Sequence, residues 1–449
     1  MGLWQQAAGM AAKAPPERNR YVDFLRAFSI LAVVVGHWLV AAPYLDAEGT
    51  VRGGHLLGLL PWTQWLTWGF QVMPLFFLVG GFSNAMSWSA TRRKQGHYSD
   101  WFASRVQRLI NPVFPVLLGW ALFAFAATMA GMDRANVEMA VMLALVPVWF
   151  LAVYLLVTAL VPLSFAAWER WGFASFAALV AGAVAIDLLT FVARVPWVNF
   201  LNFLFVWVGI HQLGYAWRDG RFERAGTALA WFAAGLAALI ALVWFGPYPV
   251  AMIGVPGADV TNSMPPTLAL LALGVMQSGL ALALQGPARR MLERGWLWTA
   301  TVLTNGMIMT VYLWHLTAFV LVMVGAWLLG GIGLDMAPGS AEWWWSRPVW
   351  FALYIALLLP LIAVFVRWER GYSVFGPTQP RERPVPELRL VIGLLLICLG
   401  LAMTAAISIA SPMGASGVRW WVVALPFVGA ALVGFGPVRA MLLRARGLR

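Results

Sequence analysis

The chain has 449 residues and a net charge of +12, and 61% of its residues are hydrophobic while only 11% are charged. Soluble domains carry roughly 25% charged residues, so this composition excludes an ordinary soluble protein and indicates a polytopic membrane protein. The single cysteine, Cys398, excludes a disulfide framework and a cysteine-ligated metal site.

Apolar stretches long enough to cross a hydrocarbon core of about 30 Å as helices recur along the chain. They lack the apolar–polar alternation of transmembrane strands, so we predict an all-α polytopic membrane protein. The first 20 residues show no apolar segment of a cleavable signal peptide. About twelve transmembrane helices are predicted, near 22–42, 64–88, 109–130, 143–166, 173–193, 198–216, 225–245, 265–285, 300–328, 349–366, 389–410 and 420–437.

Lys and Arg residues predict the orientation, because they cluster on the cytoplasmic side of membrane proteins. If both termini are cytoplasmic, 25 of the 30 basic residues lie on cytoplasmic segments, and the other five are Arg52, Arg134, Arg194, Arg347 and Arg419. Most of the positive charge then faces anionic lipid headgroups or an anionic cofactor. This location explains the basic charge without a nucleic-acid partner, and none is predicted.

A stretch rich in proline and charge, 367–389, interrupts the hydrophobic pattern after the tenth predicted span. We therefore predict a cytoplasmic N-terminal segment (1–21), a ten-helix membrane core (22–370), a cytoplasmic linker (371–388) and two further helices with a basic tail (389–449). None of the segments between the spans is long enough to form a separate soluble domain.

The first predicted span carries three ionisable residues, Asp23, Arg26 and His37. Eleven helical steps make three turns plus about 20°, so Arg26 and His37 share one helix face about 16 Å apart. Asp23 lies one turn before Arg26 and can pair with it. Ionisable groups in a membrane usually face the bundle interior or a water-filled cavity. Arg26 alone fits an inner-leaflet anchor as well as a functional group, whereas His37 lies too deep for snorkelling.

Four further polar residues fall in later spans, and each has a structural and a functional interpretation. His315 and Tyr312 share a face of the ninth span and can be a second base, a substrate-orienting pair or a hydrogen-bonded core pair. His211, in the sixth span, fits a structural hydrogen bond or a donor-site contact. Asp187, in the fifth, fits a salt-bridge partner or an acceptor-site carboxylate. The three membrane histidines differ in predicted depth, which argues against a shared metal site, and no metal is predicted.

Five stretches of the sequence combine apolar residues with distinctive polar ones, and in chain order they are RYVDFLRAFSILAVVVGHW, LFFLVGGFSNAM, SRVQRLINPVFP, PVWFLAVYLL and VYLWHLTAF. Together they resemble the acyltransferase-3 family of integral membrane acyltransferases. An Arg, ten residues and a His in the first helix match the main signature of that family. The other matches follow in order, and the resemblance covers about residues 20–370. Two departures are a GGF in place of Ser-Gly-Phe and two extra helices where some relatives carry a soluble transferase domain.

The resemblance implies an O-acyltransferase that moves an acyl group, most simply acetyl from acetyl-CoA, to a hydroxyl of a glycan, glycolipid or other small acceptor. His37 and Arg26 would be catalytic, since His supplies a base of near-neutral pKa and Arg26 marks the donor entrance. Arg105 and Arg108 lie three residues apart before the third span, and with Arg26 they would bind the phosphates of acyl-CoA. The same two arginines also fit ordinary positive-inside flanking residues.

Two other classes remain open at this stage. A transporter or flippase for a lipid-linked or anionic substrate would use Arg26, His37 and Asp187 to line its route, although we find no internal repeat of the kind common in transporters. A scaffold subunit would leave the buried His and Arg residues unexplained. We predict a multi-pass protein of a bacterial inner membrane with lipids, acyl-CoA and a hydroxyl acceptor as partners; homo-oligomerisation stays open.

Overall fold

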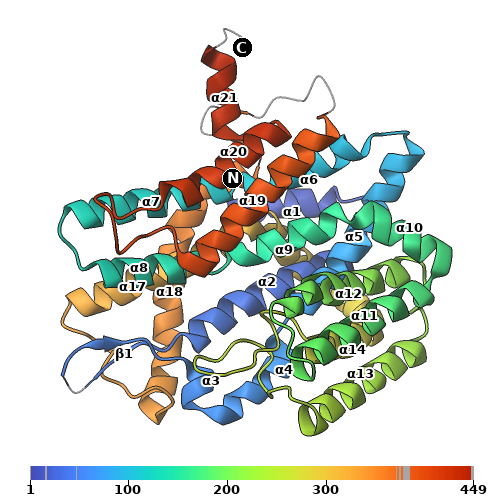
Figure 1. The fold of residues 1–449 in the computed structure, drawn as a ribbon, viewed down its shortest axis with the longest axis horizontal. Coiled ribbons are helices and arrows are strands. Elements are labelled where there is room, and N and C mark those ends of the chain that lie inside the picture. The colour runs from blue at the N-terminus through green and yellow to red at the C-terminus, as the bar shows by residue number, and fades with distance from the viewer. Residues whose placement is uncertain are drawn as a thin grey trace. The chain divides into compact units, whose positions relative to one another are not determined.

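The computed structural model (Figure 1) describes residues 2–15, 18–46, 48–370, 372–373, 376–377 and 385–445. These residues form an almost entirely helical protein, as predicted. They divide into two compact units, each built from several separate chain segments. Unit 1 consists of Met1–Ser89, Leu160–Gly306 and Asp335–Trp344, and unit 2 of Ala90–Ala159, Met307–Leu334 and Trp345–Arg449.

Unit 1 holds most of the predicted site residues. Its helices are α1 (Leu3–Ala12), α2 (Arg20–Val40), α3 (Leu56–Leu59), α4 (Thr67–Phe70), α10 (Val161–Trp171), α11 (Phe173–Phe191), α12 (Asn202–Arg218), α13 (Ala225–Phe245), α14 (Leu268–Ala283), α15 (Gln285–Met291) and α16 (Gly295–Asn305). It also contains the 3₁₀ helices η1 (Pro61–Leu66) and η2 (Val198–Leu201) and the antiparallel strands β1 (Tyr44–Leu45) and β2 (Val51–Arg52).

Unit 2 contains the helices α6 (Tyr98–Ile110), α7 (Val113–Met129), α8 (Arg134–Leu145), α9 (Val148–Ala159), α17 (Ile308–Leu328), α19 (Glu387–Ile407), α20 (Trp420–Val433) and α21 (Gly436–Ala445). The two-residue strands β3 (Tyr372–Ser373) and β4 (Gly376–Pro377) pair with each other. Two helices run from one unit into the other, α5 (Met73–Arg93) and α18 (Ala341–Glu369).

The start of α2 is determined locally by the sequence. The Asn19 side chain accepts hydrogen bonds from the backbone N–H groups of Tyr21 (3.1 Å) and Val22 (3.3 Å), as an N-cap residue does. Asp23 places a negative charge in the first turn, where the helix dipole favours it. Asn19 and Asp23 therefore set the position of Arg26 at the beginning of the helix.

Glycines bring pairs of helices into backbone contact in both units. In unit 1, a Cβ on Gly81 of α5 would overlap the carbonyl oxygen of His211 on α12, and one on Gly214 would overlap the carbonyl oxygen of Leu78. In unit 2, Gly393 of α19 and Gly429 of α20 face each other in the same way. Small residues allow such close approach between membrane helices, where van der Waals packing replaces the hydrophobic effect.

Helices α11 to α14 lie side by side in unit 1 (Figure 1), and α12 contacts α10, α11 and α14. Thirteen of the 17 residues of α12 are buried, whereas α13 buries only three of 21. At 1.5 Å per residue α12 is about 25 Å long, which is short for a hydrocarbon core of about 30 Å. The sixth predicted span is therefore a short helix enclosed by its neighbours.

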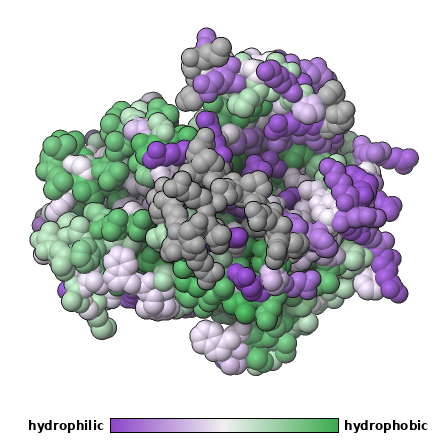
Figure 2. Space-filling view, turned by 90° about the horizontal axis from the view of Figure 1, so that it is seen from above, coloured by the Kyte–Doolittle hydropathy of each residue, from purple (hydrophilic) through white to green (hydrophobic). Residues whose placement is uncertain are grey.

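Nine helical segments of the described chain are long and apolar enough to cross a membrane. The total rises to eleven if two bent pairs, α14 with α15 (52°) and α20 with α21 (62°), each form one span. The predicted count of twelve is thus not confirmed, because α12 is too short to be counted. Large hydrophobic side chains are exposed along many of these helices, and Figure 2 shows the broad hydrophobic areas that they form at the surface. The protein is a polytopic membrane protein.

The two C-terminal helices α19 and α20 pack against unit 2 helices that precede them in the chain. Helix α19 contacts α9 and α8, and α20 contacts α7. Arg419, before α20, donates to Glu138 of α8 (3.2 Å) and to the backbone carbonyl of Ile407 (2.6 Å) at the end of α19. The predicted linker 371–388 lies largely outside the described residues.

Candidate active site

The Arg26 end of α2 holds a compact group of polar side chains in unit 1. The Arg26 guanidinium donates to Asp23 Oδ1 (3.1 Å) and to Ser83 Oγ on α5 (3.0 Å). Asp23 Oδ2 accepts from Arg18 Nε (2.6 Å), and Asn305 donates to the backbone oxygen of Asp23 (2.9 Å). The predicted Asp23–Arg26 pair is therefore confirmed, and Asp23 is shared between two arginines.

The single carboxylate of Asp23 pairs with the guanidiniums of Arg18 and Arg26. The net charge of this group of side chains is therefore positive. Asp23 is buried at 7% exposure, whereas the Arg26 side chain keeps 28% of its surface exposed. Two hydrogen-bond partners orient the Arg26 guanidinium, and part of it remains accessible. An oriented and partly accessible guanidinium is suited to binding a carboxylate or a phosphate.

His37 lies in the last turn of α2, which ends at Val40. Along the helix axis it is about 16 Å from Arg26 and on the same face. Its side chain is partly exposed, while the neighbouring Val34 and Trp38 are buried. His37 therefore lies near one end of α2, and Arg26 lies near the other.

Arg105 and Arg108 lie on α6 in unit 2. Helix α6 is separate from α7 because the helix is interrupted at Asn111 and Pro112. The Arg105 guanidinium is 4.5 Å from the ring centroid of Trp101, a cation–π contact. Arg105 is half-buried and Arg108 is exposed. The two arginines share a helix, but they have different surroundings, and their convergence with Arg26 stays a prediction.

His211 is completely buried in unit 1 and has a contact at each ring nitrogen. Its Nε2 lies 3.2 Å from Asn84 Nδ2, and its Nδ1 lies 3.1 Å from the Tyr215 hydroxyl. That hydroxyl lies 2.9 Å from Ser164 Oγ. These contacts connect α5, α10 and α12. Of the two interpretations of His211, they favour the structural hydrogen bond.

Asp187 joins four parts of unit 1 through hydrogen bonds to uncharged donors. Its Oδ1 accepts from Asn202 (2.7 Å), and its Oδ2 accepts from the Tyr248 hydroxyl (2.8 Å) and from the backbone N–H of Leu268 (2.8 Å). Leu268 is the first residue of α14, where the helix dipole favours a negative charge. Asp187 forms no salt bridge in these contacts, and both of its oxygens already accept hydrogen bonds from the protein. The contacts therefore favour a structural role for Asp187 over either predicted one.

Tyr312 and His315 are both buried on α17 of unit 2. The Tyr312 hydroxyl donates to the backbone oxygen of Pro147 (2.8 Å), and His315 Nδ1 lies 2.7 Å from the backbone oxygen of Tyr312. A carbonyl oxygen can only accept, so Nδ1 carries a proton, and Nε2 is the basic nitrogen in neutral His315. The contacts fix the orientation of both rings and leave their three predicted roles open.

The chain matches the family model described as an acyltransferase domain over residues 19–367. It belongs to the acyltransferase-3 family. The match includes all of the predicted site residues from Asp23 to His315 and excludes α19, α20 and α21. Comparison with curated proteins and with solved structures returned no match. The protein is thus a multi-pass membrane acyltransferase, and the transporter hypothesis is not carried further.

Sequence reasoning missed two partners that orient the site of this acyltransferase. Ser83, which accepts from Arg26, directly follows the GGF motif, and its place beside that motif was the one available signal. Asn84, the next residue, contacts His211. Neither pairing has a local sequence pattern, because the partners are 57 and 127 positions apart. Within the described residues, no three His, Cys, Asp or Glu side chains lie close enough together to hold a metal ion.

Proposed function

We propose that this acyltransferase transfers an acyl group, most simply acetyl, from acyl-CoA to a hydroxyl of a glycan, glycolipid or other small acceptor. The observation that carries the proposal is the arrangement on α2. An oriented and partly exposed Arg26 side chain lies at one end, and the His37 imidazole lies on the same face about three turns away. A pantetheine arm has an extended length on the order of 15–20 Å, comparable to three helical turns.

His37 acts as the general base in this mechanism. It accepts the proton of the acceptor hydroxyl as the oxygen attacks the thioester carbonyl. The carbon–sulfur bond then breaks, and the thiol leaves with the proton that His37 returns. The product is an ester together with free coenzyme A, so protons and electron pairs balance without a further reactant. A neutral imidazole is suited to both proton transfers because one ring nitrogen can accept a proton and then return it.

The arginines bind the donor. Arg26 keeps part of its guanidinium accessible while Asp23 and Ser83 orient it. Arg105 and Arg108 of α6 carry planar guanidiniums, which are suited to the pyrophosphate through bidentate hydrogen bonds. Because most basic residues fall on one predicted side, we place both termini and the donor in the cytoplasm, and the protein in a bacterial inner membrane.

The test is acyl transfer by purified protein in detergent. His37→Ala should lower the transfer rate by about two to four orders of magnitude, as expected when a general base is lost, while the unfolding temperature stays unchanged. His97→Ala is the matched control, since His97 is exposed just before α6. A His37→Ala protein that keeps more than half of the activity would exclude His37 as the base.

A further inference from the structure

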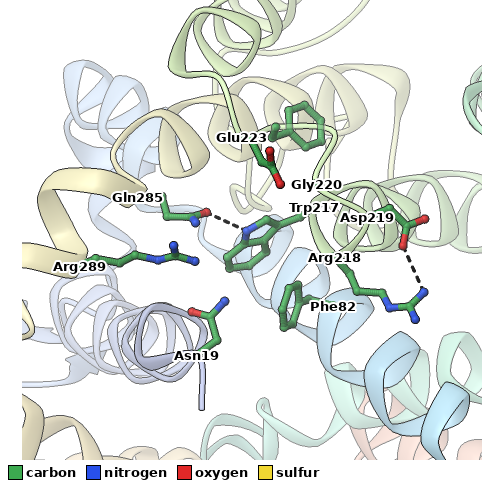
Figure 3. Close-up of a pocket in the computed structure, with 10 residues that line it drawn as sticks. Asn19, Phe82, Trp217, Arg218, Asp219, Gly220, Glu223, Gln285 and Arg289 are labelled. Atoms are coloured by element: carbon green, nitrogen blue, oxygen red, sulfur yellow. Dashed lines mark hydrogen bonds and ion pairs between the residues drawn. The ribbon is translucent and has the colours of Figure 1, made fainter. Parts of the chain in front are cut away.

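A cavity of about 500 Å³ lies in unit 1 beside the N-terminus of α2 (Figure 3). Small-molecule sites typically measure about 300–1,000 Å³, so the cavity is large enough for a ligand. Its wall includes Asn19, one turn before Asp23, and Phe82, the neighbour of Ser83. The cavity therefore adjoins the polar group around Arg26.

Two aromatic rings form one wall of the cavity. The rings of Trp217 and Phe82 have centroids 4.7 Å apart. The Trp217 indole N–H donates to Gln285 Oε1 (2.8 Å), and Tyr21 packs against the indole at 6.0 Å with its ring edge-on. These contacts fix the orientation of Trp217. Phe82 is more exposed than Trp217 and offers its ring to a ligand.

The charged groups of the wall differ in whether they already have partners. Arg218 pairs with Asp219 (3.1 Å), which also accepts from the Trp168 indole N–H (2.8 Å). Arg289 of α15 is exposed and makes no hydrogen bond or ion pair within the described parts of the chain. Asn19 uses its side-chain oxygen to cap α2, which leaves its amide N–H₂ as a donor. Arg289 and Asn19 thus provide positive and neutral donors to a ligand.

We propose that this cavity binds the nucleotide end of the acyl-CoA donor, an inference that rests on the donor named in the proposed function. In Figure 3, Arg289 and Asn19 lie on one side of the Trp217 indole and Glu223 lies on the other. The phosphate on the ribose of the nucleotide accepts charge-assisted hydrogen bonds from Arg289. The adenine base stacks on Phe82. Glu223 repels phosphate, so it faces the amino group of the base.

The length of α2 agrees with this placement. Asn19 precedes Arg26 by seven residues and His37 by eighteen, about 10 Å and 27 Å along the helix. A donor with its nucleotide beside Asn19 passes Arg26 with its phosphates and extends its thioester toward His37. A lipid headgroup has no aromatic ring to stack on Phe82, so it would use only the charges of the cavity.

The experiment compares two donors, acetyl-CoA and acetyl-pantetheine, which has the same thioester but lacks the nucleotide. Arg289→Ala should raise the KM for acetyl-CoA about tenfold, the effect of about 1.4 kcal/mol of lost binding, and leave the KM for acetyl-pantetheine unchanged. Arg290→Ala is the matched control, because Arg290 is the next residue of α15, is exposed and does not line the cavity. An equal effect of Arg289→Ala on both donors, or no effect on either, would overturn the proposal.

A binding measurement tests whether the cavity holds a nucleotide, independently of acyl transfer. Adenosine 3′,5′-bisphosphate should bind the wild-type protein in calorimetry, and Phe82→Leu and Arg289→Ala should each weaken that binding about tenfold or more. Wild-type protein that binds this nucleotide but transfers acetyl from neither donor would disprove the proposed function and leave the nucleotide site standing. A wild-type protein that transfers acetyl from both donors with equal KM would disprove the nucleotide site alone.

Discussion

His37 and His211 both lie on helices of unit 1 and in predicted spans, yet they have opposite surroundings. His211 is completely buried, and both of its ring nitrogens are engaged by residues of α5 and α12. His37 is partly exposed in the last turn of α2. The difference teaches that a buried imidazole with both ring nitrogens engaged is explained by packing, so His37 rather than His211 is the candidate base.

The largest expected effect on stability is that of replacing His211, and it tests the comparison of the two histidines directly. His211→Ala removes the contacts to Asn84 and Tyr215 and leaves a cavity, so it should destabilise the protein by about 3 kcal/mol. The protein that remains folded should keep its transfer rate. The measurement is thermal unfolding in detergent together with activity per folded molecule, and the expected pattern is opposite to that of His37→Ala. Unchanged stability with lost transfer would instead move His211 into the active site.

A smaller effect is expected at the glycines beside the two histidines. Gly81→Ala would press a methyl group against the His211 carbonyl, which should cost about 2 kcal/mol of stability. Gly36→Ala, next to His37, meets nothing within 4 Å, so it should be neutral or slightly stabilising. Unfolding temperatures of the two variants test whether α12 is tightly packed and the His37 end of α2 is open. Equal destabilisation by both variants would contradict this difference.

The smallest effect concerns the arginines of α6. Arg108→Lys keeps the charge but loses the planar fork, so it should weaken acetyl-CoA binding about threefold, and less at high salt because Arg108 is exposed. Arg105→Lys should have a larger effect, since it also alters the contact with Trp101. Calorimetry at two salt concentrations measures both. If lysine substitutes freely at both positions, these residues are only positive-inside flanking charges.

The sequence by itself determined the features that depend on local geometry. Helical period and apolar length predicted the membrane helices, and the spacing of three residues predicted the Asp23–Arg26 pair, which is present at 3.1 Å. The order of short motifs predicted the acyltransferase-3 family, which the match over residues 19–367 confirms. These predictions hold because residues a few positions apart on one helix have fixed relative positions.

Only the tertiary structure decided which polar groups are accessible and which are engaged. Ser83 beside Arg26, the surroundings of His211, the hydrogen bonds of Asp187 and the cavity beside Asn19 all join residues that are distant in the chain. Their positions depend on how closely helices approach, and glycines such as Gly81 and Gly214 set that distance through backbone contact. A hydrophobic pattern shows that a helix is in the membrane, but it does not show which neighbour each face meets.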